Sequence, residues 1–307
     1  MSKSLPRKKK LKKVYTGLGA EELRAFIVSL RQKKYSPATL RIRQRAVMDL
    51  CGYLKGQGCE RLADVNLNDL DGYRGHIVER GFNSNSVNSY LWSVRKFFDF
   101  LEETQRIFSN PSKGLKIPAL NRSLQPVPTE AEMTQLLSGP DMLKSTGTRD
   151  RAILEVMYAT GVRQGELLRM KIFDPDFERG IIRVMGKGSK ERIVPLGKHA
   201  LHWLRQYMRQ ARLRLIKKKV DEQALWVSKD GYRLSGIRVD QMIREYAKKA
   251  GIKKKVSAHS LRRACATHML MGGAHPVQLQ MLLGHSSLQT LSQYVRKRPT
   301  NPSIPQG

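Results

Sequence analysis

The sequence predicts a mainly α-helical protein that has two domains and one small β-hairpin or sheet. Most of its 307 residues follow the three- and four-residue apolar spacing of amphipathic helices. A stretch rich in proline and glycine, residues 109–128, interrupts that spacing and separates two helical regions. Two short β-type runs, at residues 181–185 and 193–196, flank a Gly-Lys-Gly-Ser turn and predict the hairpin.

The first domain is expected at residues 18–108, after a basic arm at residues 1–17. Ser36 followed by Pro37 is a typical cap and first residue of a helix, and Gly81 is a typical helix end. Apolar residues from Val87 to Leu101 recur at spacings of four and three, which predicts the inward face of the last helix. The expected helices are residues 20–33, 37–55, 68–80 and one that opens at Asn83 or Ser84.

The second domain is expected at residues 129–296, after a linker at 109–128 and before a tail at 297–307. Thr129 should cap its first helix, Gly161 should end the second at 149–159, and another helix should begin near Arg163. The hairpin follows. The further expected helices are residues 198–214, 236–250, 259–271, 276–283 and a last short helix that carries Tyr294.

The charge of the chain predicts a polyanionic partner. Lys and Arg number 57 against 26 Asp and Glu, so the net charge is +31. Seven of the basic residues lie in residues 1–13 without an acidic neighbour, and the rest of the chain still carries +24. An anionic membrane is the weaker alternative, because residues 2–13 have only Leu5 and Leu11 as apolar residues and no apolar run approaches about 18 residues. We therefore expect a nucleic acid as partner and no membrane association.

Six polar residues are the expected nucleic-acid contacts outside the chemical site. Two of them share one face of the helix at 37–55, and three lie on the polar side of the helix that begins near residue 84. The sixth lies in the hairpin turn. These residues are Arg41, Arg45, Asn85, Arg95, Lys96 and Lys190.

The cysteines argue for a reducing compartment and against a zinc site. Cys51, Cys59 and Cys265 form no CxxC pattern, and an odd number at such spacing is typical of free thiols. We expect a cytoplasmic protein.

Three segments carry residues suited to phosphate chemistry. In Thr160-Gly161-Val162-Arg163, the glycine breaks a helix and leaves the arginine at the start of the next, where free N–H groups favour an anion. Glu166 could hold that arginine in place, although an ordinary surface ion pair is the alternative. The hairpin turn puts Lys187 at a tip. Its pattern does not fit the phosphate-binding GxxxxGK[ST] loop, and a solvated turn is the alternative.

The third segment adds His259 and Arg262, one helical turn apart, followed by His285 and Tyr294. A single histidine here would more often be a core or cap residue. Two arginines, two histidines, a lysine and a tyrosine together describe a phosphoryl-transfer site that has no acidic metal ligands.

In these segments the chain resembles the tyrosine recombinases of the integrase superfamily, with a layout closest to Xer-type and short transposon- or phage-type enzymes. TGVRQGEL resembles the first arginine box of the family, and MGKGSKERIVPL resembles its β-hairpin lysine box. AHSLRRACATHML resembles the HxxR box, and LLGHSSLQTLSQY resembles the segment from the second histidine to the tyrosine. All four follow the family order over residues 129–296. Residues 18–108 are similar to its helical core-binding domain.

The resemblance implies a two-domain fold, with a helical core-binding domain and an α+β catalytic domain, and a specific division of labour. Arg163 and Arg262 would clamp the scissile phosphate, and Tyr294 would attack it to form a 3′-phosphotyrosyl link. His259 would assist as acid or base, and Lys187 would protonate the departing 5′-oxygen. His285 would hydrogen-bond to the phosphate. No cofactor, metal ion or ATP is implied.

The resemblance also implies double-stranded DNA as partner and a homotetramer on two synapsed DNA duplexes, in the nucleoid of a prokaryotic cytoplasm. Arg263 and Gly165 depart from residues common in the family without removing a catalytic group. The tail carries Pro299, Pro302 and Pro305, which disfavour a helix, so we expect a monomer free in solution. A type IB topoisomerase and a catalytically silent DNA-binding protein of the same fold are the alternative functions.

Overall fold

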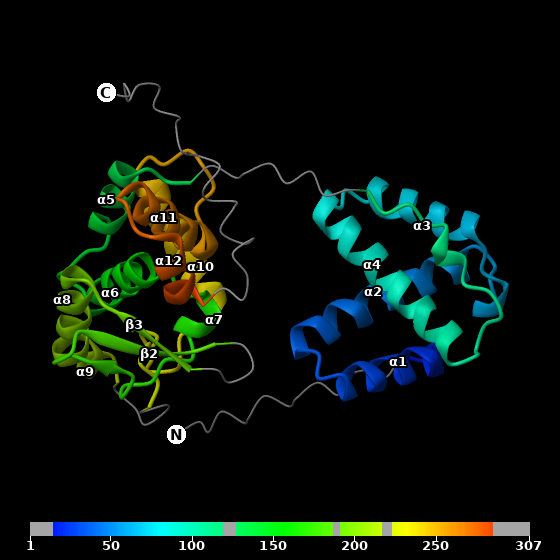
Figure 1. Cartoon of the computed structure of the whole chain (residues 1–307), viewed down its shortest axis with the longest axis horizontal. Helices are drawn as coiled ribbons and strands as arrows, with labels where there is room; N and C mark the ends of the chain where they lie inside the picture. The colour runs from blue at the N-terminus through cyan, green and yellow to red at the C-terminus, as the bar shows by residue number, and fades with distance from the viewer. Residues whose placement is uncertain (1–14, 119–126, 187–190, 217–222, 285–307) are drawn as a thin grey trace, which may run out of the picture. The chain divides into compact units, whose positions relative to one another are not determined.

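The computed structural model describes residues 15–118, 127–186, 191–216 and 223–284. The chain divides into two compact units, Met1–Ser123 and Leu124–Gly307, each with its own apolar core (Figure 1). We describe each unit by itself. Within the described residues, no helix combines the length and the apolar composition that crossing a bilayer requires.

The N-terminal unit is built from helices, as the sequence predicts. Ser36 caps its second helix by accepting a hydrogen bond from the backbone N–H of Thr39 at 3.2 Å, and Asn83 caps its fourth through the N–H of Ser86 at 2.9 Å. The aromatic rings of Phe26 and Phe97 meet edge to face in the core. The helices are α1 (Ala20–Gln32), α2 (Pro37–Gly56), α3 (Leu67–Glu79) and α4 (Ser84–Glu103), with a 3₁₀ turn at Leu62–Asp64 between α2 and α3.

The structure differs from the expected extended linker at residues 109–118. Residues 111–113 form a 3₁₀ turn, and Ser112 and Leu115 are buried against the N-terminal unit. The buried side chain of Asn88 donates a hydrogen bond to the carbonyl of Pro118 at 2.6 Å. Because Ser112 and Leu115 are buried there and α4 binds the segment through Asn88, residues 109–118 belong to the first unit.

The C-terminal unit contains helices and a small antiparallel sheet that has one buried and one exposed face. The sheet has the order β1–β2–β3, and Arg183 on β2 pairs with Ile193 on β3. Its strands are β1 (Pro175–Asp176), β2 (Ile181–Met185) and β3 (Glu191–Pro195). The helices are α5 (Glu130–Ser138), α6 (Ser145–Thr160), α7 (Gln164–Leu167), α8 (Lys198–Gln206), α9 (Arg212–Leu215), α10 (Gly236–Lys249), α11 (Ala258–Met271) and α12 (Pro276–Leu283).

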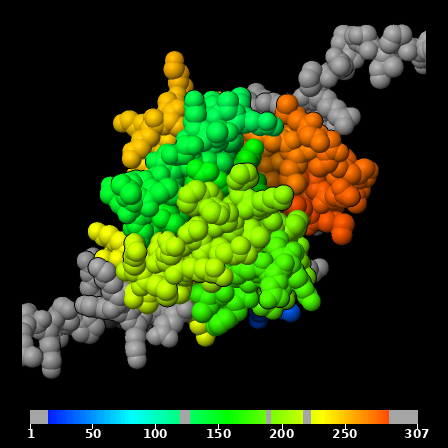
Figure 2. Space-filling model, turned by 90° about the vertical axis from the view of Figure 1, so that its left-hand side faces the viewer, coloured from blue at the N-terminus to red at the C-terminus, as the bar shows by residue number. Residues whose placement is uncertain are grey.

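Helix α6 runs through the centre of this unit. It packs against α8 and α11, and its residues from Ala152 to Met157 are buried (Figure 1). Figure 2 shows the face on which the yellow-green segment that contains α8 lies beside the green α5–α6 region and the orange α11–α12 region. Because α6 is covered on several sides, it is buried around most of its circumference, and its buried residues include the charged side chains of Arg149, Asp150 and Glu155.

Three details of this unit differ from the sequence prediction. Helix α6 begins at Ser145, four residues before the expected start, and the short strand β1 was not predicted. The helix expected at 198–214 is divided by a π-helical turn at Tyr207–Ala211. The Tyr207 hydroxyl in that turn donates to the carbonyl of Leu225 at 2.9 Å and accepts from the N–H of Val227 at 3.2 Å.

Candidate active site

The turn between α6 and α7 positions Arg163. Gly161 ends α6 in the left-handed conformation, with φ of 58°, and its N–H reaches the carbonyl of Met157 at 3.0 Å. Arg163 is then the residue that caps the start of α7, and its side chain is 48% exposed. The local sequence thus presents a guanidinium group at the opening of a helix, as predicted.

Glu166 anchors this arginine from below. Its carboxylate accepts from the Arg163 backbone N–H at 2.9 Å and from Arg163 Nη1 at 2.8 Å, and its side chain is only 2% exposed. Burial alone would raise the pKa of Glu166. Hydrogen bonds from Arg192 and from the Arg163 backbone, together with the positive charge of Arg192, outweigh burial and lower the pKa to about 2. Glu166 is therefore a fixed negative charge at neutral pH.

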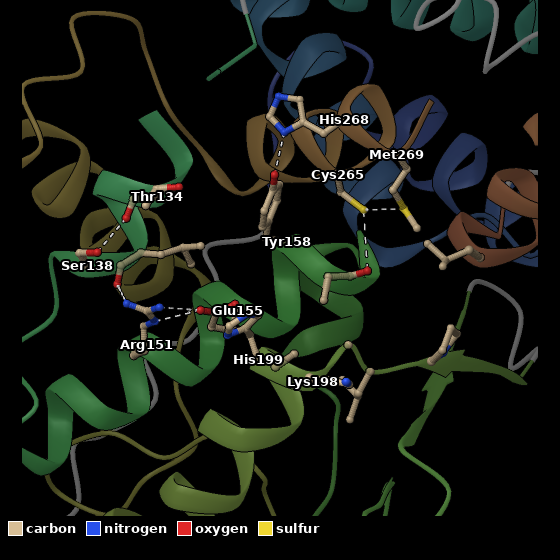
Figure 3. Close-up of a pocket in the computed structure, with 17 residues that line it drawn as sticks. Thr134, Ser138, Arg151, Glu155, Tyr158, Lys198, His199, Cys265, His268 and Met269 are labelled. Carbon is tan, nitrogen blue, oxygen red and sulfur yellow. Dashed lines mark hydrogen bonds and ion pairs between the residues drawn. The ribbon is translucent and has the colours of Figure 1, made fainter. Parts of the chain in front are cut away.

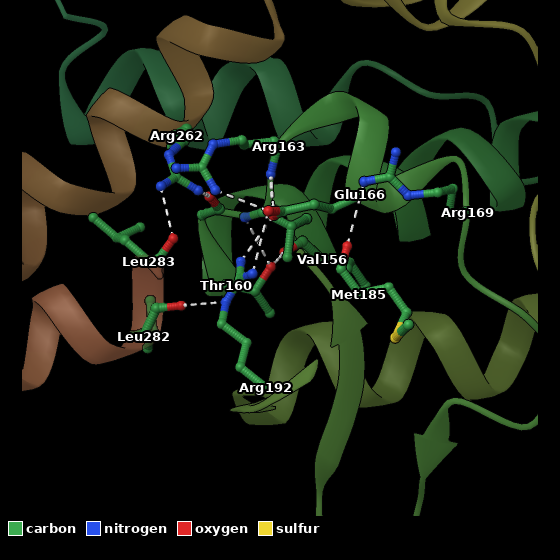
Figure 4. A network of polar contacts seen from close by, with 12 residues as sticks. Val156, Thr160, Arg163, Glu166, Arg169, Met185, Arg192, Arg262, Leu282 and Leu283 are labelled. Atoms are coloured by element: carbon green, nitrogen blue, oxygen red, sulfur yellow. Dashed lines mark hydrogen bonds and ion pairs between the residues drawn. The ribbon is translucent and has the colours of Figure 1, made fainter. Parts of the chain in front are cut away.

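Arg192 on β3 is a site residue that the sequence analysis missed. It forms a two-pronged contact with Glu166, from Nη1 to Oε1 at 3.2 Å and from Nη2 to Oε2 at 2.8 Å (Figure 4). Its Nε donates to the carbonyl of Leu282 at 3.1 Å. It lies inside the segment that resembles the lysine hairpin of the family. The only sequence signal for it was its position directly before two apolar strand residues.

Arg262 is held on the other side of the α6–α7 turn. It lies in the second turn of α11, which Ser257 caps, and it is 3% exposed. Its Nη1 donates to the carbonyl of Gly161 at 2.5 Å, and its Nη2 donates to the carbonyl of Leu283 at 2.8 Å (Figure 4). These bonds bring the start of α11, the end of α6 and the end of α12 together.

His259 completes the described part of the site. It is an exposed residue of the first turn of α11. Partial desolvation and the positive charges of Arg263, Arg262 and Arg163 lower its pKa, so the neutral ring predominates at neutral pH. A neutral imidazole can accept a proton. The structure therefore brings Arg163, His259 and Arg262 together around the α6–α7 turn.

The other three predicted catalytic residues, Lys187, His285 and Tyr294, lie outside the described residues, as does Lys190. Two of these residues, Lys187 and His285, directly follow described segments in the sequence. Strand β2 ends at Met185, and α12 ends at Leu283, whose carbonyl binds Arg262.

Of the predicted nucleic-acid contacts in the N-terminal unit, four residues are exposed and one, Arg95, is partly buried. Arg41 and Arg45 are exposed on α2, where they line a shallow hollow with Asp49, and Asn85 is exposed at the start of α4. Lys96 is exposed but forms an ion pair with Asp99 at 3.1 Å.

Arg95 differs from the expectation that it points outward. It is partly buried, its Nε donates to the carbonyl of Ser112 at 3.3 Å, and its Nη2 donates to the carbonyl of Leu115. Arg95 thus holds the segment after α4 by hydrogen bonds, because the carbonyl groups of the buried residues Ser112 and Leu115 need donors.

An open, largely apolar pocket of about 690 Å³ lies between α5, α6, the start of α8 and α11 (Figure 3). Tyr158 and His268 line it and share a hydrogen bond of 2.8 Å between the hydroxyl and Nδ1. None of Arg163, His259 and Arg262 lines this pocket. It is therefore separate from the arginine site.

The sequence matches the phage integrase family over residues 127–301 and the N-terminal SAM-like domain of phage integrases over residues 23–105. The first match covers more than half of the chain. The chain belongs to the phage integrase family. The integrase match includes all six predicted catalytic positions, Arg163, Lys187, His259, Arg262, His285 and Tyr294.

Curated relatives support the same assignment. Tyrosine recombinase XerD of Pseudomonas putida is 38% identical over 71% of this chain and 72% of its own length. Tyrosine recombinase XerD of Shewanella oneidensis is 36% identical over 79% of this chain and 80% of its own length. A lambda integrase tetramer bound to a Holliday junction has a TM-score of 0.73 at 18% identity, covering 92% of this chain and 79% of that one. The last likeness shows that this integrase-family chain shares the fold.

Proposed function

We infer that this protein is a site-specific DNA recombinase of the tyrosine type. It cuts and rejoins DNA strands through a 3′-phosphotyrosyl intermediate. The observation that carries this inference is the convergence of Arg163, Arg262 and His259 around one turn, in a chain of the phage integrase family. Its relatives named tyrosine recombinase XerD support the same activity.

The chemistry follows from the groups at the site. The Tyr294 oxygen attacks phosphorus, the bond from phosphorus to the 5′-oxygen breaks, and Lys187 gives that oxygen a proton. His259 is neutral and can take the proton of the phenol, whose ordinary pKa of about 10 makes it a poor nucleophile without help. Arg163 and Arg262 neutralise the non-bridging oxygens as charge builds. Attack by the 5′-hydroxyl of a partner strand reverses these steps.

The phosphotyrosyl bond keeps the energy of the broken phosphodiester, so the proposed reaction needs no ATP. Arg163 and Arg262 neutralise the charge that a metal ion would otherwise neutralise, so the proposed reaction needs no metal ion. Cleavage should therefore continue in EDTA. A requirement for an added divalent cation would contradict this mechanism.

Replacement of the nucleophile tests the proposal. With a nicked substrate that traps the intermediate, the wild-type protein should form a covalent DNA adduct and Tyr294→Phe should form none. DNA binding by the variant should stay within about tenfold, since the hydroxyl need not contribute much to ground-state binding. An undiminished adduct from Tyr294→Phe would remove Tyr294 as nucleophile. Absence of any adduct from the wild type would favour a silent DNA-binding protein.

A type IB topoisomerase would perform the same cleavage but relax DNA instead of exchanging strands. A plasmid that carries two copies of the target site separates the two functions. Recombination between the copies supports strand exchange, whereas relaxation without recombinant product supports the topoisomerase. The target can be found by selecting bound fragments of the source genome.

Double-stranded DNA is the proposed partner, in the cytoplasmic nucleoid of a prokaryote. The solved neighbours include a lambda integrase dimer on a core site and a lambda integrase tetramer on a Holliday junction. We propose a homotetramer on synapsed DNA and a monomer in free solution. Proposed DNA contacts outside the site are Arg41, Arg45, Asn85, Lys96, Lys190 and, in addition to its structural bonds, Arg95.

The tail after Tyr294 tests the proposed assembly. Deletion of residues 299–307 should impair two-site recombination more than single-site cleavage. Sedimentation without DNA should show a monomer. A stable tetramer without DNA, or full recombination by the truncated protein, would overturn this part of the proposal.

A further inference from the structure

Arg192 occupies the junction of three elements around the arginine site. It belongs to β3, it grips Glu166 of α7 with two hydrogen bonds, and it donates a third to the carbonyl of Leu282 in α12 (Figure 4). Its side chain is 15% exposed, and that of Glu166 is 2% exposed. Through these bonds one side chain links segments 26 and 90 residues away in sequence.

We propose that Arg192 is a positioning residue of the cleavage reaction. It fixes Glu166, and Glu166 fixes both the backbone and the guanidinium of Arg163. Its bond to Leu282 places the end of α12, where the next carbonyl, of Leu283, binds Arg262. Arg192 therefore sets the separation of the two arginines that bind the phosphate, and this role rests on the function proposed above.

The three hydrogen bonds that Arg192 donates require the geometry of a guanidinium group. A planar guanidinium can present parallel N–H groups to a carboxylate and another N–H to a carbonyl, whereas an ammonium acts as a point charge. Gly284, with φ of 63°, leaves room for the stem of Arg192. A Cβ atom at residue 284 would lie 3.2 Å from Arg192 Cδ, Cζ and Nε. The end of α12 is thus built to approach this side chain closely.

Single-turnover cleavage of the trapping substrate at saturating protein tests the role. Arg192→Met should lower the cleavage rate constant at least about a hundredfold and leave the DNA dissociation constant within about tenfold. Arg192→Lys should recover only a small part of the rate, because it keeps the charge but not the fork. Arg183→Met is the matched control. Arg183 lies on the neighbouring strand, half exposed and 3.8 Å from Asp174, and its replacement should leave the rate unchanged.

Three further measurements distinguish positioning from a loss of fold. In a double-mutant cycle, Glu166→Gln with Arg192→Met should be no slower than the slower single variant, because both remove the same support. A methylphosphonate at the scissile position removes the charge that the arginines neutralise, so the Arg192→Met defect should shrink on it. The defect should persist on a substrate with sulfur at the bridging 5′ position, which relieves only the need for a leaving-group proton.

The proposal is overturned if Arg192→Met cleaves at the wild-type rate, if the effects of the two substitutions multiply, or if sulfur at the 5′ position restores its rate. If Arg192→Met does not fold, then full activity of Arg192→Lys overturns it. These outcomes require that the wild-type protein forms the Tyr294 adduct. If the wild type forms none, the proposed function fails rather than the role of Arg192.

Discussion

Glu166→Gln should destabilise the catalytic unit by an amount that the buried ion pairs predict. The change keeps the shape of the side chain and removes its charge, which leaves Arg192 with a neutral partner. A lowering of the Glu166 pKa from 4.5 to about 2 corresponds to roughly 3 kcal/mol of stability at neutral pH, at about 1.4 kcal/mol per pKa unit. The group is almost fully buried, so solvent screening reduces this value little.

The destabilisation should depend on pH in a defined direction. The folded-state pKa of Glu166 is lower than the unfolded-state value, so its stabilising effect is complete above about pH 5 and is lost as pH falls from about 4.5 toward 2. The gap in unfolding free energy between wild type and Glu166→Gln should therefore be constant from pH 7 to 5. By pH 3.5 it should have narrowed by more than about 1 kcal/mol.

Urea unfolding followed by tryptophan fluorescence measures this gap. The full-length chain with Trp92→Phe, which removes an exposed ring of the N-terminal unit, leaves Trp203 and Trp226 as reporters in the catalytic unit. Glu178→Gln, a change at an exposed glutamate of the same unit, is the control and should cause no gap. A gap below about 1 kcal/mol at pH 7, or one that stays unchanged at pH 3.5, would refute the reasoning.

Three further predictions concern the chemistry, the charge and the turn. Lys187→Ala should slow cleavage strongly and be rescued by a 5′-bridging sulfur, because a thiolate leaves without a proton; absence of rescue in a gel assay would exclude Lys187 as the acid. Deletion of residues 1–13 should make the salt dependence of DNA affinity shallower, by about 0.9 in log–log slope for each phosphate that the arm neutralises in the full-length protein. Titrations on specific and random DNA should show that the site preference is retained. Gly161→Ala should cost at least about 1–3 kcal/mol in urea unfolding, because φ is 58° and the new Cβ would lie 2.4 Å from Leu283 Cδ2; wild-type stability would contradict the geometry.

Local signals explain why much of the fold could be predicted. Helix caps and helix ends act within a few residues, as Ser36, Asn83 and Gly161 show. The positions of the helices could therefore be predicted from residues that are neighbours in the sequence. The grouping of Arg163, His259 and Arg262 followed from the boxes that resemble the integrase superfamily. The described structure brings these three together.

The rest depended on contacts that sequence spacing does not encode. Arg95 lies on the expected face of α4, but its guanidinium turns to carbonyl groups 17 and 20 residues later. That same contact keeps residues 109–118 on the N-terminal unit, where the proline-rich pattern predicts an extended linker between the domains. The pairing of Arg192 with Glu166 spans a strand and a helix, and no helical or strand period connects these positions.

Main-chain carbonyl groups hold two of the arginines around the site: Gly161 and Leu283 hold Arg262, and Leu282 holds Arg192. A carbonyl is present whatever side chain its residue carries. A mutational scan that replaces side chains would therefore score positions 282 and 283 as ordinary apolar positions, although their peptide groups aim two guanidinium groups. Beside the carboxylate of Glu166, which binds Arg192, the path of the backbone therefore keeps these arginines in place. Changes that redirect that path, such as an insertion directly after α12, would reveal it.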